Sequence, residues 1–267
     1  MSLFRLSSRQ MLSKSFALVL CAFVLVSTTS CTSAKSEMQS GLINDPIEPF
    51  NRGMFAFNDA LDRAVLEPVA KVYNFITPDF FRAGVQNFMR NLRTPLIVAN
   101  NVLQGDFKGA GVASARFVIN TVGGIGGLFD LAGDQGLHYE PEDFGQTLAV
   151  WGLGEGFYVV LPVLGPSTLR DTAGMAVDTL ADPVRLYAMN RDEEWIYYTR
   201  GAVEGIDNRA RMVNAVRDMR RNSLDYYAAV RSAYTQKRRS LVRDVAHAEQ
   251  AQSAKPQAVQ YYDEAWD

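Results

Sequence analysis

The residue with the clearest covalent chemistry in this sequence is Cys31. It ends a segment in which a basic start (Arg5, Arg9 and Lys14) leads into the apolar run Ser15–Val26 and then into small hydroxyl residues. A basic start, a short apolar run and a small-residue cleavage site form, in this order, a secretory signal. One class of bacterial signal is cleaved directly before a cysteine, whose thiol then carries acyl chains. The order predicts a signal peptide over residues 1–30 and an exported protein with covalent lipid on Cys31.

The match at Cys31 is imperfect, because Thr28 stands three residues ahead of it, where a larger aliphatic residue is usual. Ordinary secretory cleavage after Ala34 is the alternative, and Cys21 fits less well because Leu20 occupies a position that requires a small residue. The apolar run is about a dozen residues long, short of the ~20 that span a bilayer as a helix. The segment is therefore an export address rather than a permanent span.

Composition argues against several classes of protein. The full chain has a net charge of −2, and cleavage before Cys31 removes three basic residues and no acidic one, which leaves −5. This balance does not favour nucleic acid as a partner. If Cys21 leaves with the signal and Cys31 carries lipid, the mature chain has no free thiol for a disulfide or a metal site. The remaining 237 residues (267 minus 30) suffice for one domain.

Side chains that could support an enzyme are sparse. The chain has two histidines, so no histidine-rich metal site is expected. The acidic cluster Glu140–Asp143 beside His138 resembles an acid/base set in residue type, but we expect it to be solvated surface, as charged loop clusters usually are. Ser167 lacks the Gly-x-Ser-x-Gly elbow of a hydrolase, and the glycines of 123–127 fit no phosphate-binding loop. We expect no enzyme, no metal and no cofactor beyond the covalent lipid.

The elements that must hold any site are mostly helices. Phe50, Met54, Phe57, Leu61 and Val65 recur at helical spacing, which predicts an amphipathic helix. Proline repeatedly follows a residue that can cap a helix, so the first hundred mature residues predict short helices in succession. These pairs are Asp45-Pro46, Glu67-Pro68, Thr77-Pro78, Thr94-Pro95 and Asp182-Pro183.

Further along, residues 95–103 and 116–122 are apolar over much of a helix circumference, which predicts that they are buried or touch lipid. Residues 157–162 have the β-branched and aromatic content of a strand. A helix is expected over 169–180 with Ser167 as its N-cap, and one or two helices over 192–246. Residues 32–43 predict a tether and residues 251–267 a disordered tail, so the folded domain is expected at 44–250.

Several blocks of the sequence, in order, resemble those of the MlaA/VacJ outer-membrane lipoproteins. Together they span roughly residues 44–200, and an ordered set of blocks is more specific than any single motif. The blocks are Asn44–Asp59, Asn100–Gly105, Arg116–Thr121, Glu142–Leu148, Trp151–Gly154 and Leu161–Asp171.

The resemblance implies a mainly α fold: a single domain of short amphipathic helices that form a ring around a channel, with a glycine-rich hairpin. It implies a lipid-transport channel at the periplasmic face of the outer membrane, which removes phospholipids mislocalised in the outer leaflet and maintains lipid asymmetry. Thr32, where an aspartate often signals inner-membrane retention, agrees with outer-membrane routing.

The resemblance also implies partners and site residues. The partners are phospholipids, the outer-membrane bilayer, a trimeric porin and a soluble periplasmic lipid carrier that returns the lipid to the inner membrane. Phe50 and Asn51 match the segment whose disturbance is expected to misgate the channel, and Gly152, Gly154 and Gly156 match the hairpin expected to adjust it. The alternative is a structural envelope lipoprotein that scaffolds porins or other partners without moving lipid.

Overall fold

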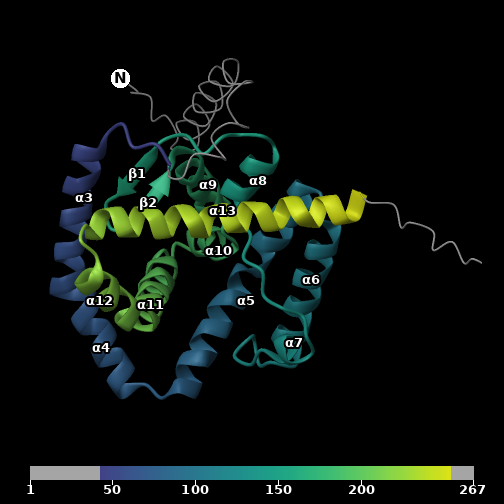
Figure 1. Ribbon diagram of the computed structural model, residues 1–267. Coiled ribbons are helices and arrows are strands. Elements are labelled where there is room, and N and C mark those ends of the chain that lie inside the picture. Colours follow the sequence, from purple (N-terminus) through teal and green to yellow (C-terminus); the bar gives the residue numbers. More distant parts are fainter. Residues whose placement is uncertain (1–42, 254–267) are drawn as a thin grey trace, which may run out of the picture. The chain divides into compact units, whose positions relative to one another are not determined.

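The computed structural model describes residues 43–253, with side chains described for 43–242. The predicted signal peptide, Cys31 and most of the predicted tether and tail lie outside the described residues. Within them the fold is helical apart from one two-stranded hairpin, as Figure 1 shows. The elements are α3 (Glu48–Leu61), the π-helix η1 (Asp62–Leu66), α4 (Glu67–Ile76), α5 (Asp79–Gln104), α6 (Phe107–Val122), α7 (Leu131–Asp134), α8 (Phe144–Val150), β1 (Tyr158–Leu161), β2 (Gly165–Thr168), α9 (Leu169–Ala181), α10 (Pro183–Asn190), α11 (Trp195–Arg211), α12 (Val213–Asn222) and α13 (Tyr226–Ser253).

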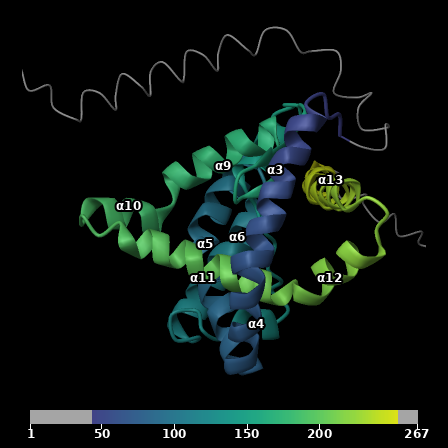
Figure 2. The same ribbon diagram turned by 90° about the vertical axis from the view of Figure 1, so that its left-hand side faces the viewer.

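The helices follow one another around the molecule. In Figure 1, α3, η1 and α4 descend along one edge, α5 returns from the lower corner, and α6 runs beside it. The hairpin, α8 and α9 lie at the upper end, and α13 crosses the middle. Figure 2, turned by 90°, shows α10 and the start of α11 projecting to one side and α12 joining α11 to α13. No helix among the described residues is both long and apolar enough to cross a membrane.

Burial is reversed relative to that of a water-soluble domain. Among the described residues, 18 buried residues are polar or charged and 13 are hydrophobic. On α6, Arg116 and Asn120 are buried, whereas Val118 and Val122 are exposed. On α3, Asn51 is fully buried, while Phe50 of the predicted apolar stripe is 56% exposed. Large exposed apolar surfaces of this kind mark contact with lipid or with another protein.

One end of the molecule concentrates this apolar surface. The α4–α5 corner exposes Phe75 by 89% and Phe80 by 79%, and Ile76 and Phe81 are also exposed. The loop between α6 and α7 packs against the first half of α5, where the Asn87 side chain donates to the carbonyl of Leu128 at 3.3 Å. That loop and the end of α6 add further exposed apolar side chains, namely Val122, Ile125, Leu128 and Phe129.

The hydrophobic core is small and lies under the hairpin. Ile43, Tyr158, Val160 and Tyr227 are buried together, with Met54, Phe55 and Tyr234 packed around them. Ile43, which the prediction places in the tether, is only 2% exposed and belongs to this core. The sequence does not indicate this core position, because most of the residues before Ile43 are small and polar.

Pro95 does not start a helix, as the Thr94-Pro95 pair predicted, but lies inside α5. The proline removes the backbone donor that would bond to the carbonyl of Asn91. Next to it, the Thr94 hydroxyl donates to the carbonyl of Arg90 at 3.0 Å. Leu96 and Ile97 beside it are buried. Packing of this stretch therefore outweighs the local cost of the proline.

The other predicted boundaries are partly right. Asp182 caps α10 as expected, but the N-cap of α9 is Thr168, whose hydroxyl accepts from the backbone N–H of Asp171, and not Ser167. The predicted one or two helices over 192–246 are three, because α11 ends near Met212 and α12 ends before Ser223. Helix α13 continues to Ser253, past the predicted domain end at 250.

The predicted strand at 157–162 is confirmed as β1, which pairs antiparallel with β2 in the register Tyr158 opposite Thr168 and Leu161 opposite Gly165. The turn between them places Val163 and Gly165 at positive φ. Gly152, Gly154 and Gly156 lie in the loop before β1 rather than in the paired strands. The predicted glycine-bearing segment is thus the approach to the hairpin.

Candidate functional site

Asn51 joins α3 to the hairpin. Its side-chain amide donates to the carbonyl of Tyr158 at 3.0 Å and to the Asp45 carboxylate at 2.7 Å, and its Oδ1 accepts from the backbone N–H of Val160 at 2.9 Å. Asn51 is fully buried, so all three bonds are shielded from water. The Asn51 amide thus binds one carbonyl and one N–H of β1, as a neighbouring strand would.

Asn58 repeats this arrangement two helical turns further along α3. Its amide donates to the carbonyl of Leu161 at 2.8 Å, and its Oδ1 accepts from the N–H of Val163 at 2.7 Å. Sequence reasoning missed Asn58, although its seven-residue spacing from Asn51 places both on one helix face. Phe50, predicted beside Asn51, turns outward and is exposed. Of the two predicted gating residues, Asn51 therefore contacts the hairpin and Phe50 faces away from it.

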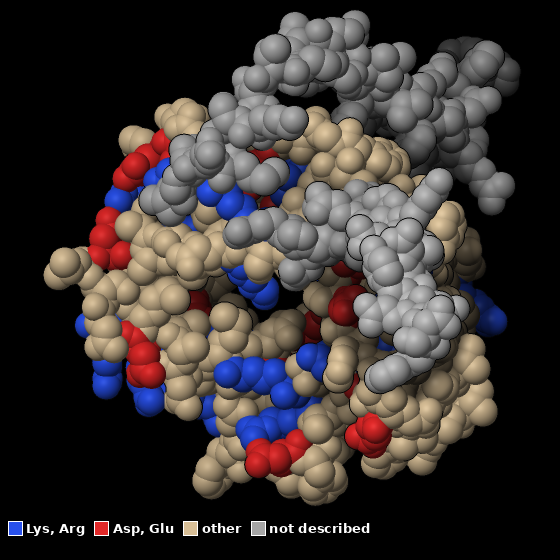
Figure 3. All heavy atoms as spheres, turned by 45° about the vertical axis from the view of Figure 1, so that its right-hand side comes forward, with Lys and Arg blue, Asp and Glu red and all other residues tan. Residues whose placement is uncertain are grey.

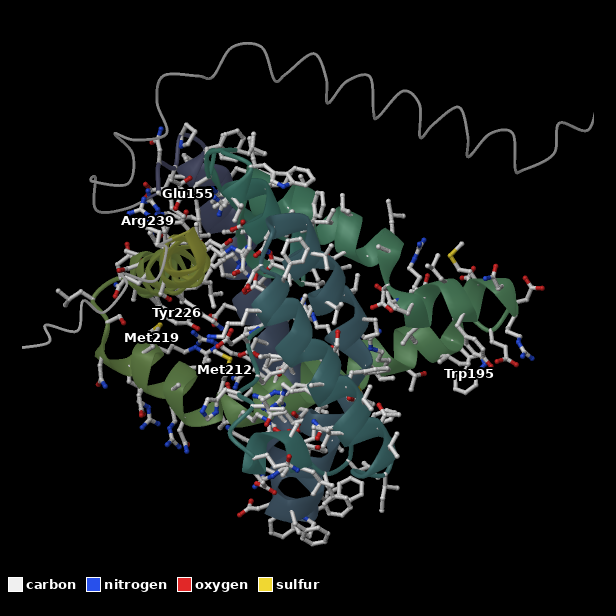
Figure 4. The ribbon with its side chains drawn as sticks, turned by 90° about the vertical axis from the view of Figure 1, so that its right-hand side faces the viewer. Glu155, Trp195, Met212, Met219, Tyr226 and Arg239 are labelled. Carbon is white, nitrogen blue, oxygen red and sulfur yellow. The ribbon has the colours of Figure 1, made fainter. Side chains whose placement is uncertain are left out.

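The glycine segment before β1 is fastened at its centre. Gly152 and Gly156 adopt positive φ values of 90° and 69°, and a Cβ at Gly156 would lie 3.1 Å from the Cβ of Leu169. Between them Glu155 accepts two hydrogen bonds from Arg239 of α13, at 3.0 and 3.2 Å. Figure 4 shows Glu155 and Arg239 together beside α13. Gly154 is exposed and directly precedes Glu155, whose pairing with Arg239 we call the Glu155 clamp.

The turn of the hairpin reaches a large cavity of about 840 Å³. Its walls come from elements far apart in the sequence, and the face drawn in Figure 3 is hollowed at its centre, with basic and acidic side chains around the opening. The apolar lining includes Leu66, Leu96, Val163, Leu164, Pro166, Met175, Ala202 and Ile206, and the charged lining is Arg93, Arg200, Arg238, Asp143, Asp171, Asp178, Asp182 and Glu204. The cavity is therefore amphipathic.

Most of these charges are held in place. Arg238 of α13 binds Asp143 through two hydrogen bonds of 2.6 Å and approaches Asp171 at 2.9 Å. Burial alone would raise the pKa of Asp143, but the hydrogen bonds from Arg238 hold it below its ordinary value. Arg200 binds Asp182 at 2.7 and 2.8 Å. Burial raises the pKa of Asp178, which accepts from the N–H of Phe144.

The acidic cluster around His138 is only partly the solvated surface that we expected: His138 and Glu140 are exposed, whereas Glu142 and Asp143 are partly buried. Asp143 is fixed to Arg238, and Glu142 accepts from Gln104 at 3.0 Å. Burial raises the pKa of Glu142 to about 7. Within residues 43–242 no hydrogen bond joins His138 to either carboxylate. The cluster holds α8 in place, since Asp143 also caps that helix through the N–H of Gln146.

None of the residues that line the cavity is among the predicted site residues Phe50, Asn51, Gly152, Gly154 and Gly156. Arg93, Glu204 and Arg238 belong to three different helices, and each alone reads as an ordinary charge on a helix surface. The sequence contains only a weak indication of this cavity. Gly201 and Gly205, one turn apart on α11, leave one face of a helix unusually open.

Comparisons with known proteins agree with this architecture. The model of the family described as MlaA lipoprotein matches residues 43–241. The "Intermembrane phospholipid transport system lipoprotein MlaA" of Escherichia coli strain K12 is 36% identical over 215 residues, covering 78% of this chain and 81% of that protein. Its namesake from Haemophilus influenzae is 33% identical, with 82% and 87% covered, and an uncharacterized protein of Rickettsia bellii is 39% identical, with 75% and 78% covered.

A solved structure from a study called "Structural basis for maintenance of bacterial outer membrane lipid asymmetry" has a TM-score of 0.66 and 39% sequence identity. The match covers 74% of this chain and 99% of the solved one. The mainly α fold expected from the sequence is thereby confirmed. The family model matches most of the chain, and the chain belongs to the MlaA lipoprotein family.

Proposed function

We propose that this protein is a lipid-transport channel of the outer membrane. It removes phospholipids mislocalised in the outer leaflet and passes them to a soluble periplasmic carrier for return to the inner membrane, which maintains lipid asymmetry. The observation that carries the proposal is the amphipathic cavity, enclosed by helices that bury polar side chains and expose apolar ones. The relatives from Escherichia coli and Haemophilus influenzae, which are named as phospholipid transport system lipoproteins, support it.

The cavity matches the chemistry of a phospholipid. Its volume of about 840 Å³ is in the upper part of the ~300–1,000 Å³ range of ligand pockets. A phospholipid has a charged head and two apolar chains, so its path must offer both kinds of surface. Val163, Leu164 and Met175 offer apolar contacts, and the loosely held charges of Arg93 and Glu204 offer polar ones.

The apolar exterior and the predicted anchor support the proposed position in the membrane. The helices of residues 43–253 expose apolar side chains, and none of them is long and apolar enough to span a membrane. Such helices suit a protein seated in one leaflet. In this proposal Cys31 carries acyl chains and holds the protein at the periplasmic face, while a trimeric porin covers part of the outward surface. The mass of the mature amino terminus, together with membrane fractionation, tests the anchor and the location at once.

The hairpin turn is the proposed gate. Val163 and Leu164 line the cavity and are more than 60% exposed, while Asn51 and Asn58 fix the strand behind them. Gly154, next to the Glu155 clamp, lies where the approach to the hairpin can adjust. Gly154→Pro is expected to raise surface phospholipid without releasing the protein from the membrane. Normal surface phospholipid in that variant would argue against this gate.

The channel itself is tested by filling it. Gly201 and Gly205 line the cavity, and a Cβ at either position meets no atom within 4 Å. Replacing both with leucine also favours the helix, by up to about 1 kcal/mol each. We expect the folded double variant to stop transfer of labelled phospholipid from donor vesicles to an acceptor. The matched control is Gly111→Leu on α6, where a Cβ also meets nothing but which does not line the cavity.

The same assay separates the channel from the scaffold alternative. A scaffold would bind its envelope partners and move no lipid, so wild type and plugged protein would behave alike. Undiminished transfer by the Gly201→Leu/Gly205→Leu protein would reject the cavity as the route.

A further inference from the structure

The charges that line the cavity fall into two groups. Arg238 and Arg200 are each bound by carboxylates at 2.6–2.9 Å, which leaves them little freedom to meet a ligand. Asp178 accepts hydrogen bonds from the N–H of Phe144 and the amide of Asn100. These groups hold α8, α9, α10, α11 and α13 together around the cavity.

Arg93 and Glu204 are held differently. Their closest atoms are 3.9 Å apart, and the side chains are 44% and 30% exposed. Within residues 43–242 neither side chain makes a hydrogen bond, and Arg93 acts on the carboxylates of Asp143 and Asp178 only through longer-range charge interactions. Arg93 comes from α5 and Glu204 from α11, on two walls of the cavity. Among the charged side chains of the lining, Arg93 and Glu204 are therefore the cation and the anion that can bind a ligand without breaking a hydrogen bond.

The helix around Glu204 leaves room for a ligand. Gly201 and Gly205 flank it on α11, both line the cavity, and nothing lies within 4 Å of a Cβ built on either. The lining as a whole has three arginines against five acidic residues. Because Arg238 and Arg200 are already bound by carboxylates, an anionic ligand would find one available cation in a field that is otherwise negative.

We propose that Arg93 and Glu204 form a binding site for a zwitterionic phospholipid head. The guanidinium of Arg93 binds the phosphate, for which its paired donors are suited, and the carboxylate of Glu204 binds the ammonium group. The ligand inserts between the two charges and replaces their weak mutual contact. The cavity therefore prefers phosphoethanolamine heads over anionic glycerol phosphate heads. This inference rests on the proposed lipid channel and names its substrate class.

The test uses the full-length protein purified from membranes. It is incubated with an equimolar mixture of phosphatidylethanolamine and phosphatidylglycerol with identical acyl chains, and bound lipid is quantified by mass spectrometry. Wild type is expected to retain phosphatidylethanolamine about threefold over phosphatidylglycerol, a size typical of one partly exposed charge contact. Glu204→Gln should bring this ratio to about one, while Arg93→Gln should lower the amount of both lipids about threefold or more.

Two controls keep the result specific. Arg93→Lys retains the cation and should retain most binding. Arg63→Gln removes an arginine that is 57% exposed, pairs with Asp59 on α3 and does not line the cavity, and should change nothing. Because the Arg93–Glu204 contact is loose and partly exposed, all variants should melt like wild type.

The outcomes are distinct. No preference in wild type, or an unchanged lipid ratio in Glu204→Gln, would overturn the head-group assignment, although transfer and its block by the Gly201→Leu/Gly205→Leu plug would leave the channel intact. A wild-type protein that binds and transfers no lipid would instead overturn the proposed channel, and this inference with it.

Discussion

Asn51 and Asn58 lie two turns apart on one face of α3, and each uses its side-chain amide to bind one carbonyl and one N–H of the hairpin. Asn51 binds the buried middle of β1, and Asn58 binds its end and the turn. One helix face thereby holds the middle and the end of the strand whose turn lines the cavity.

The two asparagines are expected to differ in their contribution to stability. Asn51→Ala leaves the buried N–H of Val160 and carbonyl of Tyr158 without partners and should cost about 3 kcal/mol, whereas Asn58→Ala exposes its partners to solvent and should cost about 1 kcal/mol. Thermal unfolding in detergent measures both. Hydrogen exchange should accelerate at Val163 in the second variant. Equal costs would show that the hairpin is held mainly by other contacts.

Glu142 should make stability depend on pH. Burial raises its pKa from about 4.5 to about 7, so the folded protein keeps a proton that the unfolded chain loses. This contribution to stability is therefore complete below about pH 4.5, is lost as the pH rises through 7 and then levels off. The total loss is about 2 kcal/mol after allowance for partial exposure.

The variant Glu142→Gln keeps an acceptor for Gln104 and removes the titration. Its melting temperature should vary less than that of wild type between pH 5 and 7 and exceed it at pH 8. The exposed neighbour Glu140→Gln is the control. A slope that persists in Glu142→Gln would assign the dependence to another group.

Arg220 ties two walls of the molecule together. It donates to Asp59 and Asp62 at 2.7 and 3.0 Å and to Glu67 at 3.0 Å, while Arg209 also binds Asp62. Arg220→Met leaves the carboxylates of α3, η1 and α4 facing one another with one cation fewer and should lower stability by about 3 kcal/mol. The exposed Arg221→Met should stay within about 0.5 kcal/mol of wild type in the same melts. Similar melting of the two variants would contradict the role of this network.

The apolar end should bind membranes without the lipid anchor. The mature chain with Cys31→Ser is expected to float with phospholipid vesicles, because Phe75 and Phe80 can enter the bilayer. Adding Phe75→Glu and Phe80→Glu should weaken vesicle binding at least about tenfold, since each buried phenylalanine contributes about 1.5–3 kcal/mol. Leu224→Glu, at a fully exposed position between α12 and α13, should not. Loss of flotation on Cys31→Ser alone would show that the acyl chains are the main attachment.

The sequence by itself determined the local structure and the family. The periodicity from Phe50 predicted α3, the β-branched run before Pro162 predicted β1, and Asp182-Pro183 predicted the start of α10; all three depend on neighbours within a few residues. The ordered blocks indicated the MlaA family, and the family model confirms it. Where local preference was opposed by packing, as at Pro95, the sequence prediction was wrong.

Only the tertiary structure decided which face of each helix is the inside. The pattern on α3 separates Phe50 and Phe57 from Asn51 and Asn58 but does not say which set meets solvent, lipid or the cavity; the asparagines turn inward because the hairpin supplies their hydrogen-bond partners more than a hundred residues later. The cavity has the same origin. Asp143 and Arg238 meet across 95 residues, and Arg93 faces Glu204 from another helix. Periodicity fixes which residues share a face, whereas the pairing of faces depends on long-range packing.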